Sequence, residues 1–241
     1  MTTERVSAED VTAVILAAGT GDRLGGDLPK QYVPLGDRDN PTRTVIDLLL
    51  EGYAASGLVA NICIVASDEH FDIAGKIADR YARTRVVVGG ATRHDSVYLG
   101  VQAVETEVTI LHDAARPLLH QPALAVCIDK LRRGAQAVLT ATQPYASMLI
   151  CSENGPVSGV IERDLIAFEQ CPVAYYTADL REAFEIAAER GLSFRDEPAM
   201  MIAIRPDIIN ETAPGHRFGF KLTYPEDLEV LATYRRHLDL K

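Results

Sequence analysis

Short apolar runs rich in valine and isoleucine alternate with longer helical patterns along the chain, and this alternation constrains the fold more than any other feature. The apolar runs lie at Val11–Leu16, Asn61–Ala66, Arg85–Val88, Val108–Leu111 and Ala137–Ala141. The helical patterns between them lie at about Thr42–Ala55, Phe71–Ala82, Asp95–Val104 and Pro122–Arg133. Continuous apolar runs of this length are typical of strands buried on both faces of a sheet. The order predicts an α/β protein with a doubly wound, mostly parallel sheet, which binds ligands beyond the carboxyl ends of its strands.

After the fifth apolar run, two segments alternate polar and apolar residues around a turn. They are Ser147–Ser152 and Pro156–Glu162, and Asn154-Gly155 lies between them. Asn-Gly between alternating segments is the strongest short signal for a β-hairpin. We therefore predict a protruding β-arm at about residues 144–163, which either packs on a second subunit or folds back on its own domain.

The rest of the chain returns to helical and strand patterns. Helices are expected near Ala178–Arg190 and Glu197–Ile204, and a strand near Asp207–Glu211. A last helix starts at Tyr224 and runs to about His237, because proline and acidic residues in its first turn favour a helix start. A chain of 241 residues fits one large domain, residues 1–241, with the arm as an excursion.

Charge and composition exclude several classes of partner. The net charge of −10 argues against broad binding to nucleic acid or to anionic membranes, which require a basic surface. The chain has no run of 18 apolar residues, and Met1–Asp10 lacks the apolar segment of a signal peptide. We therefore expect a cytoplasmic protein with no nucleic-acid or membrane partner.

The cysteines and histidines do not suggest a metal site. Cys63, Cys127, Cys151 and Cys171 lie far apart, mostly among apolar neighbours, and the six histidines lack metal-ligand spacing. Buried free thiols are the expected state of all four cysteines in a reducing compartment.

Small residues and two cations follow the first apolar run. They are Ala17, Ala18, Gly19, Thr20 and Gly21, with Arg23 and Lys30 further along. Glycines leave backbone N–H groups uncovered, so such a loop can form a concavity for anions, and the cations supply charge for phosphate oxygens. The spacing differs from the Walker loop and from the dinucleotide fingerprint. The pattern indicates a polyphosphate site, and the alternative is an ordinary strand-to-helix turn with surface cations.

Two further polar clusters follow later apolar runs. Gly89, Gly90, Arg93 and Ser96 follow the third run, where the glycines permit close approach and the two side chains could contact a base or a ribose. The alternative is a helix entry with Thr92 or Asp95 near its cap.

The segment from His112 to Pro117 follows the fourth apolar run. Asp113 at the carboxyl end of a strand could hold Mg²⁺ on the phosphates of a nucleotide, because hard cations prefer oxygen ligands. Alternatively, Asp113 caps the next turn and pairs with Arg116.

Together these clusters fit nucleotidyl transfer. When a phosphate oxygen attacks the α-phosphorus of a nucleoside triphosphate, positioning and cationic stabilisation carry the catalysis. Arg23 and Lys30 beside the triphosphate, Mg²⁺ near Asp113, and Lys221 toward the attacking phosphate would suffice. Lys221 and Arg163 are weak candidates alone, because exposed cations are usually only solvated.

Five blocks of residues resemble the 2-C-methyl-D-erythritol 4-phosphate cytidylyltransferases of the non-mevalonate isoprenoid pathway, and the likeness spans nearly the whole chain. The blocks are Ala17-Ala18-Gly19-Thr20-Gly21-Asp22-Arg23, Pro29-Lys30-Gln31-Tyr32, Gly89-Gly90 with Arg93 and Ser96-Val97, His112-Asp113-Ala114-Ala115-Arg116-Pro117, and Lys221-Leu222-Thr223 before Pro225-Glu226-Asp227-Leu228. The resemblance implies a Rossmann-like nucleotidyltransferase fold that moves CMP from CTP to a polyol phosphate with release of pyrophosphate.

The resemblance also implies roles for single residues. The first loop and the segments at Gly89–Ser96 and 113–116, including Ala114 and Arg116, would bind CTP and Mg²⁺, with Arg23 and Lys30 stabilising the pentavalent phosphorus. Residues that would hold the acceptor are Lys221, Thr223, Ser147 and Arg163. The family is typically a homodimer joined through the arm, so that Arg163 would reach the site from a partner.

The acceptor side departs from the family pattern. The usual Pro-Val-x-Asp-Thr-x-Lys of the arm reads Gln143-Pro144-Tyr145-Ala146-Ser147-Met148-Leu149 here, so the aspartate becomes Ala146, the threonine Ser147 and the lysine Leu149. Thr-Pro-Gln reads Cys171-Pro172-Val173, and Asn-Ile-Lys reads Gly219-Phe220-Lys221. Losing a carboxylate at Ala146 removes a strong acceptor for substrate hydroxyls.

These departures leave other functions open. A cytidylyltransferase for another acceptor, such as ribitol 5-phosphate or a phosphonate, is one alternative. A protein that binds CTP without turnover is a second, although aligned cations at the triphosphate argue against it. A nicotinamide oxidoreductase fits less well, because the third glycine of the dinucleotide fingerprint is missing.

Overall fold

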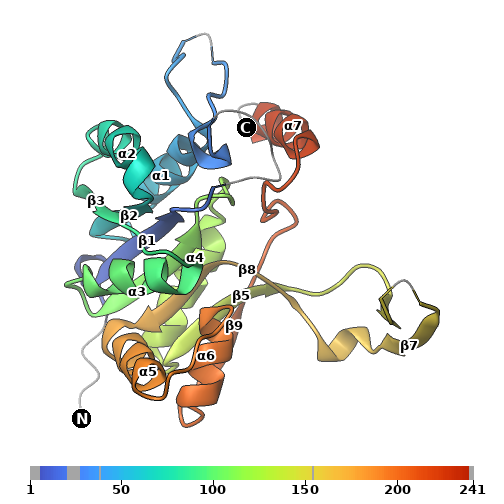
Figure 1. Ribbon diagram of the computed structural model, residues 1–241. Helices are drawn as coiled ribbons and strands as arrows, with labels where there is room; N and C mark the ends of the chain where they lie inside the picture. Colours follow the sequence, from blue (N-terminus) through green and yellow to red (C-terminus); the bar gives the residue numbers. More distant parts are fainter. Residues whose placement is uncertain (1–5, 21–27, 38, 154, 239–241) are drawn as a thin grey trace.

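The computed structural model describes residues 6–20, 28–37, 39–153 and 155–238, and it contains one large sheet with helices on both faces (Figure 1). The seven strands run in the order β3-β2-β1-β4-β8-β5-β9. Their bounds are β1 Val11–Ala17, β2 Asn61–Ala66, β3 Thr84–Val88, β4 Val108–Asp113, β5 Ala137–Thr142, β8 Phe168–Tyr176 and β9 Asn210–Pro214. The helices are α1 Val45–Ser56, α2 Phe71–Ala78, α3 Arg93–Gln102, α4 Gln121–Arg132, α5 Thr177–Glu189, α6 Glu197–Ile204 and α7 Glu226–Leu238.

The predicted doubly wound, mostly parallel sheet is confirmed. β1 pairs in parallel with β2 and β4, β2 with β3, and β5 with β9. All five strands expected from the apolar runs form, and the expected helices form within a few residues of their predicted bounds. The strand expected near Asp207–Glu211 is β9, which begins three residues later at Asn210.

β8 is the strand that the sequence analysis missed, and it runs antiparallel between β4 and β5. Proline has no amide to donate to a sheet, so Pro172 argues against a central strand. The structure accommodates it with an irregularity: Leu139 of β5 pairs with Val173, but the next residue, Thr140, pairs with Gln170. The two residues between them on β8 therefore stand outside the ladder, as in a bulge.

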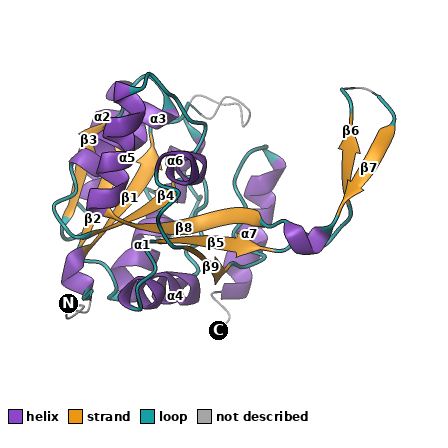
Figure 2. Cartoon of the chain, turned by 90° about the horizontal axis from the view of Figure 1, so that it is seen from below, coloured by secondary structure: helices purple, strands orange, loops and turns teal. Residues whose placement is uncertain are grey.

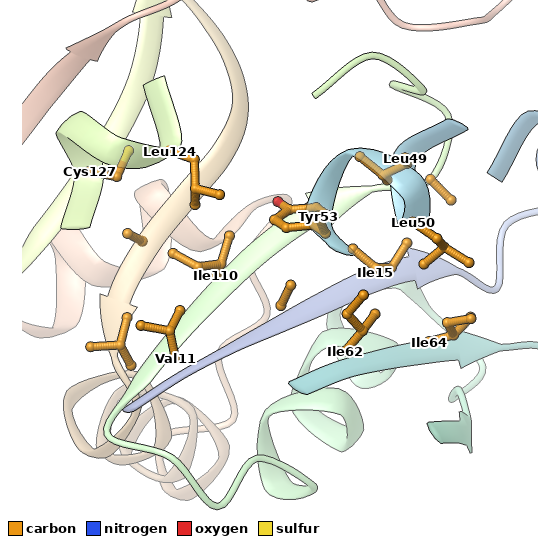
Figure 3. Packing of buried hydrophobic residues seen from close by; sticks show 14 of the residues in the cluster. Val11, Ile15, Leu49, Leu50, Tyr53, Ile62, Ile64, Ile110, Leu124 and Cys127 are labelled. Atoms are coloured by element: carbon orange, nitrogen blue, oxygen red, sulfur yellow. The ribbon is translucent and has the colours of Figure 1, made fainter. Parts of the chain in front are cut away.

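Alternate residues of each central strand supply two apolar layers. Ile15 of β1 packs with Leu49 and Tyr53 of α1 on one face, which α2 and α4 also cover (Figure 3). Val14 faces the other side, where α3, α5 and α6 pack. Burial of each such side chain contributes roughly 1.5–3 kcal/mol to folding. These two layers hold the strand ends that carry the polar residues.

The predicted β-arm is a separate two-stranded sheet of β6 (Met148–Cys151) and β7 (Val157–Ile161). The strands are antiparallel, with Met148 opposite Ile161. The arm extends away from the large sheet in both views (Figures 1 and 2). Of the two arrangements left open by the sequence, a hairpin folded back on its own domain is therefore wrong.

The cysteines differ from expectation in part. Cys63 and Cys127 are buried free thiols as predicted, but Cys151 on β6 is exposed and Cys171 on β8 is half-buried. Cys151 is exposed because it belongs to the projecting arm. No helix in the described ranges is long and apolar enough to cross a membrane.

Candidate active site

A cavity of about 460 Å³ lies where β1, β3 and β4 end and α3 begins. Residues from every one of the predicted clusters except the arm line it. They are Leu16, Ala18, Gly19, Thr20, Lys30, Gln31, Gly90, Ala91, Thr92, Arg93, Ser96, Asp113, Ala115 and Lys221. Ala17, Gly89 and Ala114 adjoin these residues in the chain, and Ala17 and Ala114 are buried. Arg23 and Gly21 lie outside the described residues.

The first loop is held by a buried glutamine. Gln31 donates from Nε2 to the carbonyl oxygens of Ala17 at 2.6 Å and Gly19 at 3.0 Å. The hydroxyl of Tyr32 also donates to the Ala17 oxygen, at 3.4 Å. Both side chains are buried, and both belong to the short 3₁₀ turn Lys30–Tyr32. Lys30 therefore reaches the cavity from a segment anchored to the loop opposite it.

The second cluster forms the start of α3. Thr92 accepts a hydrogen bond from the Asp95 amide at 3.1 Å, and the Asp95 carboxylate accepts from the Thr92 hydroxyl at 2.8 Å. This capping box matches the helix-entry interpretation of Thr92 and Asp95. Ala91, Thr92 and Arg93 at this helix start line the cavity, so the positive end of the helix dipole lies beside it and favours an anion there.

Gly89 and Ser96 bring the first two clusters into contact. A Cβ at Gly89 would lie 2.8 Å from Ser96 Oγ and 2.9 Å from Ala18 Cβ, closer than real side chains approach. Ser96 Oγ donates to the Thr92 carbonyl at 2.9 Å and accepts from the Gly90 amide at 3.2 Å. Only glycine at position 89 therefore allows this close approach of the two loops.

Asp113 lies between two cations. Its Oδ2 is 2.6 Å from Lys221 Nζ, and its Oδ1 is 3.5 Å from Arg93 Nη2. Burial alone would raise the pKa of this carboxyl, but Lys221 and Arg93 outweigh it and lower the pKa to about 2. Asp113 is therefore ionised at neutral pH, with a cation at each oxygen.

Arg93 has a second carboxylate partner, which the sequence analysis missed. Glu197, the first residue of α6, accepts from Nη1 at 2.6 Å and from Nη2 at 3.1 Å. The two residues are 104 positions apart, so no local pattern could connect them. The only sequence signal is the acidic Asp196-Glu197 pair at a helix start, which reads as an ordinary cap.

The Arg116 side chain does not pair with that of Asp113, so this part of the alternative is wrong, although the Arg116 amide donates to the Asp113 carbonyl at 2.9 Å in the turn that follows β4. Its Nη1 donates to the Gly219 carbonyl at 2.6 Å, and its Nη2 to the Glu169 carbonyl at 3.4 Å. It lines a small adjoining cavity of about 30 Å³ together with Asp113 and Cys171. Arg116 therefore ties β8 to the loop before Lys221.

His112 lies beneath the site. Its Nε2 donates to the Arg116 carbonyl at 3.0 Å, so Nδ1 of the neutral ring accepts from the Tyr53 hydroxyl at 2.8 Å. Burial lowers its pKa to about 4. At neutral pH it is an uncharged support for the Asp113 segment.

Gln170 holds the loop that carries Lys221. Its Nε2 donates to the His216 carbonyl and its Oε1 accepts from the His216 amide, both at 2.9 Å. A Cβ at Gly219 would lie 2.5 Å from Gln170 Oε1. The glycine that replaces the asparagine of the family pattern therefore leaves the space that Gln170 occupies.

The acceptor candidates do not all reach the cavity. Thr223 donates from its hydroxyl to the Lys221 carbonyl at 2.9 Å and does not line the cavity. Ser147 directly precedes β6 and Arg163 begins the 3₁₀ turn after β7, and neither lines the cavity of its own chain. The structure thus brings together Lys30, Arg93, Asp113 and Lys221, and leaves the arm residues apart.

The family model for 2-C-methyl-D-erythritol 4-phosphate cytidylyltransferase matches residues 11–236. The chain belongs to this family. Nucleotidyl transfer is therefore its class of reaction, and the resemblance drawn from the five sequence blocks is confirmed.

Individual relatives agree with this cytidylyltransferase assignment. The 2-C-methyl-D-erythritol 4-phosphate cytidylyltransferase of Nocardia farcinica is 32% identical over 227 residues, which are 92% of this chain and 93% of that protein. The protein named bifunctional enzyme IspD/IspF of Dinoroseobacter shibae is 32% identical over 239 residues. The match covers 98% of this chain and 56% of that protein, so the chain spans little more than half of its length.

A solved structure shows the same cytidylyltransferase fold. The 4-diphosphocytidyl-2C-methyl-D-erythritol synthase of Anaerococcus prevotii superposes with a TM-score of 0.81 at 22% identity, covering 95% of this chain and all of that one. The α/β nucleotidyltransferase fold is thereby confirmed.

Proposed function

We propose that this cytidylyltransferase transfers CMP from CTP to 2-C-methyl-D-erythritol 4-phosphate and releases pyrophosphate. The observation that supports the proposal is the convergence of Lys30, Arg93 and Lys221 with the start of α3 on one cavity. A chain with a net charge of −10 gathers cations there, which suits a triphosphate and a second phosphate.

In this reaction an oxygen of the acceptor phosphate forms a bond to the α-phosphorus of CTP. The bond from that phosphorus to the bridging oxygen breaks, and pyrophosphate leaves with the electron pair. Negative charge grows on the equatorial and leaving oxygens, where Lys30 and Arg23 would stabilise it. Lys221 would hold the attacking phosphate. The first loop, with Gly90 and Ser96, would bind the nucleotide.

Asp113 fits the role of a magnesium ligand. Its two oxygens offer about four lone-pair sites, of which Lys221 and Arg93 use two. The described residues contain no group of three or more metal-ligating side chains. Mg²⁺ is commonly held by one or two carboxylates and by the phosphates of a nucleotide, so Asp113 and a bound triphosphate would supply its ligands. When bound, the ion would neutralise the triphosphate charge.

We further propose that the active form is a homodimer joined through the arm. The arm and its base expose large apolar side chains, including Tyr145 at 90%, Val160 at 65% and Leu165 at 78%. Exposed apolar surface of this kind favours a partner surface. In a dimer, Ser147 and Arg163 of one subunit would reach the cavity of the other and bind the acceptor phosphate.

Two substituted residues of the arm are the reason to test a second acceptor substrate. Ala146 and Leu149 replace the aspartate and lysine of the family arm, and a site that lacks these polar groups discriminates differently among polyols. Ribitol 5-phosphate, or a small phosphonate, is therefore the alternative acceptor within the same reaction class.

The test is pyrophosphate release from CTP and Mg²⁺ with methylerythritol phosphate, ribitol 5-phosphate, and no acceptor in parallel. Release with methylerythritol phosphate alone supports the proposal. Release with ribitol 5-phosphate alone assigns the alternative acceptor. Silence with every acceptor, combined with measurable CTP binding, would contradict catalysis and favour a protein that binds CTP without turnover.

A further inference from the structure

The ion pair between Glu197 and Arg93 has no part in the reaction described above, yet it borders the cavity. We infer that Glu197 is a positioning residue that fixes the Arg93 guanidinium in the cavity wall, where Arg93 binds the nucleotide. The inference rests on the proposed use of CTP. It assigns a role to α6, which supplies no residue to the cavity itself.

The geometry of the pair supports this role. The planar guanidinium meets both carboxylate oxygens, at 2.6 and 3.1 Å, which is the bidentate arrangement that fixes orientation as well as distance. The Arg93 side chain is 43% exposed, whereas that of Glu197 is 6% exposed. The carboxylate is therefore the fixed, buried partner, and the arginine reaches past it into the cavity.

Glu197 is itself held by a rigid element. Asp196 caps α6 by accepting from the Ala199 amide at 3.0 Å. Met200 and Met201 of the same helix are buried in the apolar layer shared with α3 and α5. The first turn of α6 therefore cannot shift without disturbing the core, and the position of Arg93 is tied to that core.

Glu197 and Asp113 share the Arg93 guanidinium, and Glu197 has the closer contacts with it. Asp113 has its close contact with Lys221 at 2.6 Å, and only a single contact at 3.5 Å with Arg93. Without Glu197, Asp113 is the one carboxylate among the described ion pairs that Arg93 still has. Arg93 would then turn toward Asp113 and compete with Lys221 for the Asp113 carboxylate.

The experiment compares Glu197→Gln with a matched control, Glu211→Gln. Glu211 also pairs with a cation, Lys130 at 2.6 Å, but lies on β9 away from the cavity. CTP affinity is measured by calorimetry, and kcat and both KM values by pyrophosphate release. For E197Q we expect the Kd and the KM for CTP to rise about tenfold, with the acceptor KM unchanged and kcat within about threefold. E211Q should match the wild type within about twofold.

A double-mutant cycle tests whether Glu197 acts through Arg93. If it does, Arg93→Ala with E197Q binds CTP no more weakly than Arg93→Ala alone, because the single variant has already removed the group that Glu197 holds. The inference would be overturned if the rise in the Kd for CTP of the double variant were the product of the rises in the two single variants. A Kd for E197Q within twofold of the wild type would also overturn it.

Two further outcomes are separable. Should E197Q not fold, the same measurement is made on Glu197→Asp, which keeps the charge but is one methylene shorter. We expect a smaller rise in the Kd for CTP with this variant. An unchanged Kd would overturn the inference. Calorimetry does not require turnover. A wild type that binds CTP without releasing pyrophosphate therefore contradicts the proposed function alone.

Discussion

The cavity and the arm are organised in opposite ways. At the cavity, two loops are held by side chains of their own chain: the buried Gln31 under the first loop and the half-buried Gln170 behind the Lys221 loop. In the arm, β6 and β7 form a sheet of their own and expose Tyr145 and Val160 to solvent. The comparison teaches that the proposed nucleotide site is built from contacts within one chain, whereas the proposed acceptor site would need arm residues that lie apart from that chain's own cavity.

The departures from the family pattern lie in both regions. Those on the acceptor side include Ala146 and Leu149 of the arm, and Cys171 beside Asp113. Burial, together with the charge of Asp113, raises the pKa of the Cys171 thiol to about 12, so it stays protonated. A thiol is a weaker hydrogen-bonding group than the threonine hydroxyl of the family pattern. The residues expected to bind the acceptor are therefore less polar than the family pattern, while those expected to bind CTP retain it.

The largest effect should come from the cavity. Lys30→Ala is expected to lower kcat by about 10²–10³ with a much smaller change in CTP affinity, if Lys30 stabilises charge that develops in the transition state. Steady-state kinetics and calorimetry measure the two quantities. An equal loss of affinity and rate would instead make Lys30 an anchor for bound CTP.

The floor of the cavity should be sensitive to acid. The pKa of His112 is about 4 in the folded chain and 6.5 in the unfolded reference, so the unfolded chain takes up its proton first as the pH falls. Stability is therefore lost between pH 6.5 and 4, by about 2 to 3 kcal/mol from this residue between pH 7 and 4.5. Urea unfolding at both pH values should show this loss in the wild type and a smaller one in His112→Gln. Equal losses in both proteins would exclude His112 as the source.

A substitution in the arm should weaken binding of the acceptor and leave binding of CTP unchanged. Arg163→Ala is expected to raise the acceptor KM by about 10- to 50-fold, because a charge-assisted contact to phosphate is lost, while the Kd for CTP stays unchanged. Light scattering checks that the oligomeric state is retained. A weakened CTP affinity in this variant would break the division between the two regions.

The smallest expected effect is a gain of activity with methylerythritol phosphate. Ala146→Asp restores the carboxylate of the family pattern and should raise kcat/KM for methylerythritol phosphate by about fivefold, since a hydroxyl of the acceptor regains a partner. Activity with ribitol 5-phosphate serves as the comparison. An absence of gain would direct attention to Val173 and Gly219 as the residues that limit the acceptor.

Local patterns were sufficient for most of the fold. The apolar runs of β1 to β5 and the acidic start of α6 are written within a few neighbouring residues, so periodicity and capping reveal them. β8 was not predicted because Pro172 breaks the pattern of a central strand. Only the pairing of β8 with β5 shows how a bulge accommodates the proline.

The site was predictable to the extent that its residues follow strands. Lys30, Asp113 and Lys221 were found because they stand in short motifs at strand or helix ends. Glu197 was recognised as part of a helix but not of the site, because its partner Arg93 is 104 positions away. Gln170 was missed for the same reason, since its contact with His216 depends on the packing of distant segments.

Gly89 has a consequence for the thermodynamics of binding. It allows the loop after β1 and the start of α3 to share one contact surface, with Ala18 and Ser96 as its nearest neighbours. Where Ala18 lies against the start of α3, its backbone loses independent motion when the chain folds, so less conformational entropy would remain to be lost at this point on nucleotide binding. An added methyl group at position 89 would return part of that entropy cost to the binding step.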